Sequence, residues 1–108
     1  MRKLSKDEAR LLELLIKKAS FIISYNLEDD LDVKSMDDGG MGSLKLFPKG
    51  ISHDNRLFGK QVSECMFLDE DGIDVIASLN LDDEGELFEL DIWKTDFSSL
   101  IKIPEIIQ

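Results

Sequence analysis

Two similar acidic turns in the second half of the chain constrain the fold more than any other feature of the sequence. They are Asp69-Glu70-Asp71-Gly72 and Asp82-Asp83-Glu84-Gly85, and each separates two runs in which apolar and polar residues alternate. Aspartate favours the start of a tight turn, and glycine accepts the positive φ that hairpin turns often need. The pattern predicts three strands joined by hairpins, over about residues 59–68, 73–81 and 86–95.

Two shorter strands are expected upstream of these hairpins, over about residues 31–36 and 43–47. The glycine-rich stretch between them, Asp37-Asp38-Gly39-Gly40-Met41-Gly42, is typical of a tight turn. Pro48 lacks the N–H that a sheet ladder needs, so it should end the second strand. Pairing each strand with its neighbour in sequence is the simplest topology, which predicts an antiparallel meander of about five strands.

An amphipathic helix is predicted before the sheet. Ser5-Lys6-Asp7-Glu8 matches a capping box, in which the first and last side chains satisfy free backbone amides, so the helix should begin at Lys6. Leu11, Leu12, Leu15 and Ala19 then recur at helical spacing. Residues 21–25 could extend this helix or form a turn or a second helical piece, and the sequence leaves these alternatives open. Residues 1–108 are therefore expected to form one α+β domain, with the N-terminal helix packed on the sheet.

Strict alternation divides the last two strands between a core face and an opposite face. The predicted core face, under the helix, has Val75, Ala77, Leu79 and Leu81 on one strand and Phe88, Leu90 and Ile92 on the next. The opposite face has Ile76, Ser78 and Asn80 beside Leu87, Glu89, Asp91 and Trp93. The segment 96–104 carries enough apolar side chains to pack down as a tail, and Pro104 argues against a long helix there.

The charge balance narrows the choice of partner. Acidic side chains outnumber basic ones by 23 to 13, which gives a net charge of −10. Nucleic acid is not expected as a partner, because binding a polyanion depends on lysine and arginine neutralising its phosphates. Residues 1–27 carry six basic and three acidic side chains, whereas residues 28–108 carry seven and twenty. This asymmetry could steer a basic protein or a cation towards the sheet, or it could serve solubility alone.

The cysteine content and the N-terminal sequence bear on the compartment. Cys65 is the only cysteine, so the chain can form no internal disulfide, and a reducing compartment is the simplest fit. The N-terminus becomes polar at once, and no apolar run approaches the roughly 20 residues that are needed to cross a bilayer. We expect a cytoplasmic protein that does not contact membranes.

Motifs for cofactor, metal or nucleophilic chemistry are incomplete. The stretch 37–43 lacks the lysine and the following helix of a phosphate-binding loop. The two acidic turns lack the spacing of a calcium loop between helices, so we expect them to be solvated hairpin turns. Nucleophilic catalysis would need both Cys65 and the only histidine, His53, and a zinc site normally takes three or four such ligands. The sequence therefore predicts no cofactor and no metal site.

The candidate binding residues centre on the last predicted strand. Glu89 and Asp91 would project from one face, one pleat apart, next to the only tryptophan, Trp93. The two carboxylates could act as a general acid and base, or they could belong to an ordinary solvated face. The tryptophan could anchor a partner protein, or the C-terminal tail could cover it. Together with Asp37 and Asp38 of the glycine-rich turn, these three side chains form the predicted binding site.

Three stretches of the chain carry a family resemblance: Met36-Asp37-Asp38-Gly39-Gly40-Met41-Gly42-Ser43-Leu44, Ala77-Ser78-Leu79-Asn80 and Leu87-Phe88-Glu89-Leu90-Asp91-Ile92-Trp93-Lys94-Thr95-Asp96-Phe97-Ser98. They resemble a family of small bacterial proteins known only as a domain of unknown function. The similarity covers most of the chain, implies a bacterial and intracellular setting, and carries no assigned activity. By size and charge alone, the chain also resembles immunity proteins, which neutralise toxin domains by covering a basic site with carboxylates.

Three classes of function are compatible with these features. The first is a non-catalytic protein-binding module, immunity-like, that binds a basic protein through the predicted site. The alternative is a small ligand-binding or divalent-cation-binding domain, or an enzyme, that uses the same carboxylates. A structural module that forms oligomers is a third class, and the sequence leaves the oligomeric state open.

Overall fold

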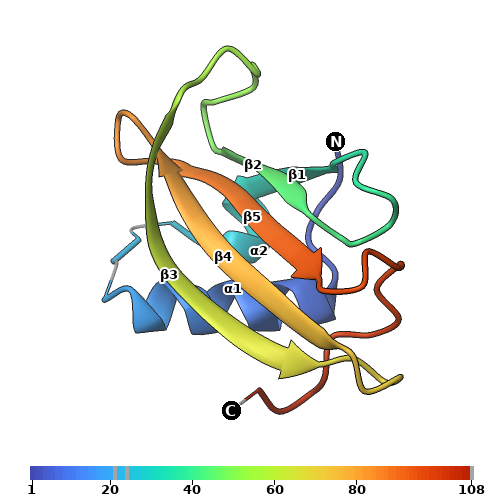
Figure 1. Cartoon of the computed structure of the whole chain (residues 1–108). Helices are drawn as coiled ribbons and strands as arrows, with labels where there is room; N and C mark the ends of the chain where they lie inside the picture. The colour runs from blue at the N-terminus through green and yellow to red at the C-terminus, as the bar shows by residue number, and fades with distance from the viewer. Residues whose placement is uncertain (21, 24, 108) are drawn as a thin grey trace.

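The computed structural model describes residues 1–20, 22–23 and 25–107. Its elements are α1 (Lys6–Lys18), α2 (Leu27–Asp30), β1 (Leu31–Ser35), β2 (Leu44–Pro48), β3 (Phe58–Leu68), β4 (Asp74–Asp82) and β5 (Leu87–Lys94). The predicted α+β class is confirmed: five antiparallel strands form one sheet, and α1 packs against one of its faces (Figure 1). No helix in the described ranges is long and apolar enough to cross a lipid bilayer.

The first helix begins where the capping box predicts. The Ser5 hydroxyl accepts a hydrogen bond from the Glu8 N–H at 3.1 Å, and the Glu8 carboxylate accepts one from the Ser5 N–H at 2.8 Å. The helix ends at Lys18 and is followed by Ala19 as its C-cap, so it does not run on through residue 20. The expectation for residues 21–25 falls partly on Phe21 and Ser24, which lie outside the described residues. A second helical piece does form, slightly later, as α2, and Asn26 caps it.

The strand order is β1-β2-β5-β4-β3, so the predicted meander describes the sheet only approximately. Neighbours in sequence pair as expected in β1–β2, β3–β4 and β4–β5. The second strand instead pairs with the last one, through Leu44–Leu90 and Lys45–Glu89. The segment 49–57 carries the chain across to the far edge of the sheet, where β3 lies (Figure 1).

The predicted core face is confirmed except at Phe88, and Leu87, which was expected on the opposite face, lies in the core instead. Its other six residues are at most 4% exposed and lie in one hydrophobic cluster with the apolar side of α1. In the β4–β5 register Asn80 pairs with Glu89, but Leu81 pairs with Leu87, which leaves Phe88 as an extra residue. Such a bulge reverses the alternation beyond it. Leu87 is therefore fully buried in the core, and the assignment of Phe88 to the core was wrong.

The C-terminal segment packs down as a tail, as its apolar side chains predict. Ile103 is 4% exposed and belongs to the core cluster. The Arg10 guanidinium on α1 donates hydrogen bonds to the carbonyls of Ile103 and Pro104 at 3.1 and 2.8 Å. The tail therefore covers the edge of the core between α1 and the β3–β4 turn, where Asp69 accepts hydrogen bonds from its backbone.

Candidate functional site

Among the described residues, no helix packs on the face of the sheet opposite α1, which is turned to the viewer in Figure 1. The register of β3, β4 and β5 aligns its side chains in three cross-strand rows. We call these nine residues the outward face: Met66, Ile76 and Trp93; Glu64, Ser78 and Asp91; Gln61, Asn80 and Glu89. The first row is apolar, and the other two carry carboxylates, hydroxyls and amides. An apolar strip thus lies directly beside an acidic one.

Trp93 lies in the apolar row of the outward face, opposite Ile76. Its side chain is 45% exposed, and its ring centroid lies 6.0 Å from that of Phe97 in the tail. Phe97 therefore flanks the indole without covering it, so the alternative in which the tail covers Trp93 is wrong, and the role of Trp93 as an anchor for a partner stays a prediction. Met66, in the same row, is 56% exposed. Exposed aromatic and methionine side chains of this kind are enriched in protein interfaces.

Glu89 and Asp91 are half-buried on this face, as alternation predicts. Partial burial raises the pKa of Glu89, and the negative charge of Asp91 raises it further. Burial likewise raises the pKa of Asp91, and the Asp38 carboxylate adds to this shift. The Asn80 amide opposes both shifts and donates a hydrogen bond to Asp91 Oδ2 at 2.8 Å. The two carboxylates are thus held close to each other and to a third acid.

The third acid, Asp38, lies in the β1–β2 loop. Burial alone would raise its pKa, but hydrogen bonds from the loop's backbone amides, with the Ser43 N–H at 2.9 Å, hold that pKa below its usual range. The Ser43 hydroxyl ties the loop to β5, because it donates to the Ile92 carbonyl at 3.1 Å and accepts from the Ile92 N–H at 2.8 Å. The loop thereby brings Asp38 beside Asp91. Asp37 is exposed in the same loop.

This arrangement predicts a measurable coupling between the loop and the sheet. Asp38→Asn removes a negative charge near Asp91, so the pKa of Asp91 should fall towards its ordinary value. Side-chain carboxyl chemical shifts followed by NMR from pH 2 to pH 7 measure this directly. Asp37→Asn is the matched control and should leave Asp91 unchanged. An Asp91 titration that is the same in the wild type and in Asp38→Asn would contradict the placement of the loop.

Asn80 belongs to the outward face but not to the binding site that the sequence predicts. Its side chain is only 5% exposed, and its Oδ1 has no hydrogen-bond partner among the described residues. A buried carbonyl oxygen without a donor is uncommon, because leaving it unpaired costs free energy. Its position directly opposite Glu89 depends on the bulge in β5, which the sequence pattern did not reveal.

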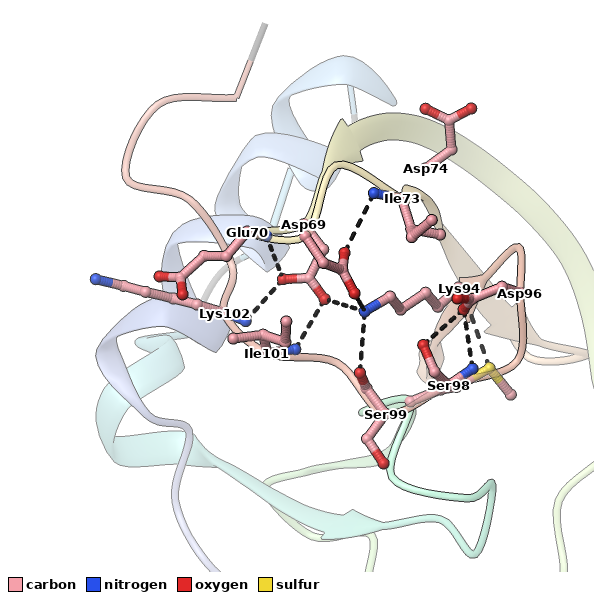
Figure 2. Close-up of polar contacts among 12 residues, drawn as sticks. Asp69, Glu70, Ile73, Asp74, Lys94, Asp96, Ser98, Ser99, Ile101 and Lys102 are labelled. Atoms are coloured by element: carbon pink, nitrogen blue, oxygen red, sulfur yellow. Dashed lines mark hydrogen bonds and ion pairs between the residues drawn. The ribbon is translucent and has the colours of Figure 1, made fainter.

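A buried lysine cluster lies on the other side of the sheet, beneath the tail (Figure 2). Lys94 Nζ donates to Asp69 Oδ2 at 2.8 Å, to Asp71 Oδ2 at 2.6 Å and to the Ser99 carbonyl at 3.2 Å. Asp69 also accepts from two backbone N–H groups of the tail, at residues 101 and 102. Every strong hydrogen-bonding group in this cluster is therefore engaged, which fits a structural role.

This cluster corrects the expectation of two solvated acidic turns. Asp69 and Asp82, the first residues of the two turns, are 4% and 3% exposed. Burial alone would raise the pKa of Asp69, but the hydrogen bonds from Lys94 and from the backbone lower that pKa to about 2. Asp82 forms a second buried ion pair, with Arg56, at 3.0 Å. The first aspartate of each turn is thus an anchor, whereas the later residues of the turns are largely exposed.

The fold does not bring the other candidate catalytic or metal-binding side chains together. Cys65 lies in the hydrophobic core, and its burial raises the pKa of its thiol, which makes it a poor nucleophile. His53 is exposed in the segment 49–57. In the part of the chain that the structure describes, no three His, Cys, Asp or Glu side chains are placed to hold a metal ion. The outward face with its neighbour Asp38 is therefore the strongest candidate site.

A comparison with protein families gives one match. The family described as "Domain of unknown function (DUF6984)" matches residues 1–104, which is nearly the whole chain. No curated protein and no solved structure matches the sequence or the fold.

Proposed function

The chain belongs to the DUF6984 family, a domain of unknown function. We propose that it is a non-catalytic protein-binding module. Its partner in this proposal is a basic protein that docks on the outward face. Toxin neutralisation in the manner of an immunity protein is one form that such a function would take. A reducing, cytoplasmic setting is part of the proposal and is supported by the single, buried Cys65.

One observation carries the proposal: an apolar row with exposed Trp93 and Met66 adjoins two half-buried carboxylates on a sheet face that neither described helix covers. Trp93 and Met66 offer apolar surface that a partner would bury. Glu89 and Asp91 are carboxylates whose negative charge is partly buried, so a cation from a partner would stabilise their charged forms. The net charge of −10 would also speed the approach of a basic protein.

The proposal is tested by affinity capture from the native host at low salt, with the tagged chain as bait. The double variant Glu89→Gln, Asp91→Asn should lose the captured protein, whereas the matched variant Asp83→Asn, Glu84→Gln, with the same charge change on an exposed turn, should keep it. The affinity for the purified partner should fall as salt rises, because exposed charges are screened. Failure to capture any specific partner, or binding that salt does not weaken, would count against the proposal.

A second candidate function is favoured by one observation, the raised pKa of both Glu89 and Asp91. Carboxylates with raised pKa values suit general acid–base work or the binding of a small cation. Calorimetric titration with calcium, magnesium and manganese, together with the melting temperature, separates this candidate from a protein-binding module. A protein-binding module predicts no binding heat and no shift in melting temperature.

A further inference from the structure

The two edges of the sheet differ in how their backbone groups are paired. At the β1 edge, Arg2 exchanges two backbone hydrogen bonds with Val33, at 2.9 and 2.7 Å, so the N-terminal segment pairs with this strand. At the opposite edge, β3 pairs with β4 on one side, and no described strand pairs with its other side (Figure 1). Such an open edge presents N–H and C=O groups to which another strand can add.

The direction of the backbone identifies which groups of β3 are open. The Asp69 N–H, just after the strand, donates to the Ile73 carbonyl on the β4 side at 3.0 Å. Backbone direction alternates along a strand, so residues 63, 65 and 67 also face β4, whereas Glu64, Met66 and Leu68 direct their N–H and C=O groups to the open edge. Met66 and Leu68 are 56% and 60% exposed, and Glu64 is exposed too. The backbone of these three residues is therefore accessible to a second strand.

The first half of β3 carries the features that usually protect an edge, and the second half does not. Register shifts interrupt the pairing with β4 twice before Ser63, and Lys60 lies between them. Bulges and lysines of this kind hinder the addition of another strand. Residues 63–68, by contrast, are in regular register and have Glu64 as their single charged side chain. This second half is the stretch of the edge that a partner strand fits.

We propose that β3 pairs antiparallel with β3 of a second copy of this chain, about a two-fold axis at Met66, so that the two sheets join into one. In this register Met66 lies opposite its symmetry mate and Glu64 lies opposite Leu68, so all three open residues pair and no like charges meet. An axis at Glu64 would place two carboxylates together, and an axis at Cys65 would bring the bulged Val62 opposite Leu68. The inference goes beyond the proposed function and does not depend on it, because the pairing needs no basic partner.

Two further features match a second copy. The apolar row of Met66, Ile76 and Trp93 would continue across the axis into the same row of the other copy. Beyond the paired residues, the exposed Lys60 of each copy would come level with the β3–β4 turn of the other, in which Glu70 is exposed. The strand itself carries one lysine and one glutamate, although the chain has a net charge of −10. The edge therefore adds no net charge repulsion to the contact.

Sedimentation and backbone amide exchange of the full chain, at about 0.15 M salt, test the inference. With rising protein concentration the mass should approach twice the 12.3 kDa of the chain. Exchange should slow at Glu64, Met66 and Leu68, by about tenfold where about nine-tenths of the chain is dimeric, because an N–H that is paired in the dimer exchanges only from the monomer. Exchange at residues 65 and 67, which already pair with β4, should not change. A chain that stays monomeric up to about 1 mM would overturn the inference.

Met66→Lys places two like charges opposite each other at the axis. It should raise the dissociation constant of the dimer by at least about tenfold, although it brings the net charge of each chain closer to zero. Ile106→Lys is the matched control, because it makes the same charge change on a tail residue that is 77% exposed, and it should keep the dimer. Equal dissociation constants for these two variants would place the contact away from the β3 edge and overturn the inference.

Disulfide trapping tests the register and needs no charged substitution. In a Cys65→Ala background, Met66→Cys should form an intermolecular disulfide on mild oxidation, because its two Cα atoms would lie about 5.5 Å apart across the axis. Leu68→Cys, at a residue of similar exposure, should be trapped at most about a tenth as fast, since its symmetry mate lies about 13 Å further along the strands. Equal trapping of the two variants, or protection in the dimer that falls outside β3, would contradict the proposed pairing.

Discussion

Asp69→Ala is expected to lower the free energy of unfolding by about 3 kcal/mol, the usual cost of breaking a buried ion pair from one side. The substitution removes the carboxylate that accepts hydrogen bonds from Lys94 and from the backbone N–H groups of Ile101 and Lys102. It leaves the lysine on the core side of the sheet with Asp71 as its remaining anionic partner. The C-terminal tail should loosen at the same time, because two of its backbone N–H groups lose their acceptor.

Thermal unfolding measures the effect, and a loss of this size lowers the melting temperature of a small domain by roughly 15 °C. Glu70→Ala is the matched control, because Glu70 is the exposed neighbour in the same turn. It should change the melting temperature by no more than about 2 °C, since surface substitutions cost little. Similar melting temperatures for the two variants would show that the buried lysine cluster does not hold the tail.

The same cluster predicts how stability depends on acid. The pKa of Asp69 is lowered from 3.8 to about 2 in the folded chain, so folding favours its charged form. Its contribution to stability is therefore fully present above about pH 5 and is lost as the pH falls from there towards 2. The unfolding free energy of the wild type should fall over this window more steeply than that of Asp69→Ala. Parallel curves in urea titrations at pH 2, 3, 4 and 6 would contradict this account.

Arg56→Ala is the second substitution with a large expected effect, a loss of about 3 kcal/mol in unfolding free energy. The guanidinium donates to the carbonyls of Leu46 and Leu87 at 2.6 and 2.5 Å and pairs with the buried Asp82 carboxylate at 3.0 Å. The guanidinium carbon of Arg56, Cζ, also lies 5.2 Å from the centre of the Phe88 ring. Removal of the side chain leaves a buried carboxylate without its cation and frees the segment 49–57 from β2 and β5.

Urea unfolding of Arg56→Ala and of Lys49→Ala measures this effect against an exposed residue at the start of the same segment. Lys49→Ala should unfold at the same urea concentration as the wild type. Hydrogen exchange should become faster at the N-terminal end of β5 in Arg56→Ala, because the Leu87 carbonyl at that end loses its hydrogen bond from the guanidinium. A loss of less than about 1 kcal/mol in Arg56→Ala would mean that ordinary surface contacts, and not this anchor, position the segment.

The strands and the helix could be predicted because their signals are local. The turn residues at Gly72 and Gly85 and the capping box at Ser5 act on their immediate neighbours, and all three features lie where the sequence places them. The pairing of β2 with β5 could not be predicted. It depends on the path of residues 49–57, which Arg56 fixes through partners that are distant in sequence.

The bulge at Phe88 and the burial of Lys94 mark the limits of the alternation argument. A bulge is invisible to a strict period of two, so Phe88 and Leu87 exchange their predicted roles. For Lys94 the signal was present, because the period that buries Leu90 and Ile92 also points residue 94 inward. Charged residues are rarely buried unless they are paired, and the pairing with Asp69 is a tertiary contact that spacing alone does not reveal.

The candidate site was predictable to a similar extent. Glu89, Asp91 and Trp93 share a face because they alternate along one strand, and this part follows from the sequence. The approach of Asp38 to Asp91 depends on the hydrogen bonds between Ser43 and Ile92, which close a long-range contact. The unpaired oxygen of Asn80 likewise becomes visible only in three dimensions.

Trp93→Ala tests most directly whether the outward face binds a basic protein. Calorimetric titration of the captured partner should give an affinity that is lower by roughly thirtyfold or more, the loss typical of an aromatic hot spot in an interface. The melting temperature should stay within about 2 °C of the wild type, because the indole is 45% exposed and lies outside the core. A folded Trp93→Ala chain that binds the partner as tightly as the wild type would contradict the claim.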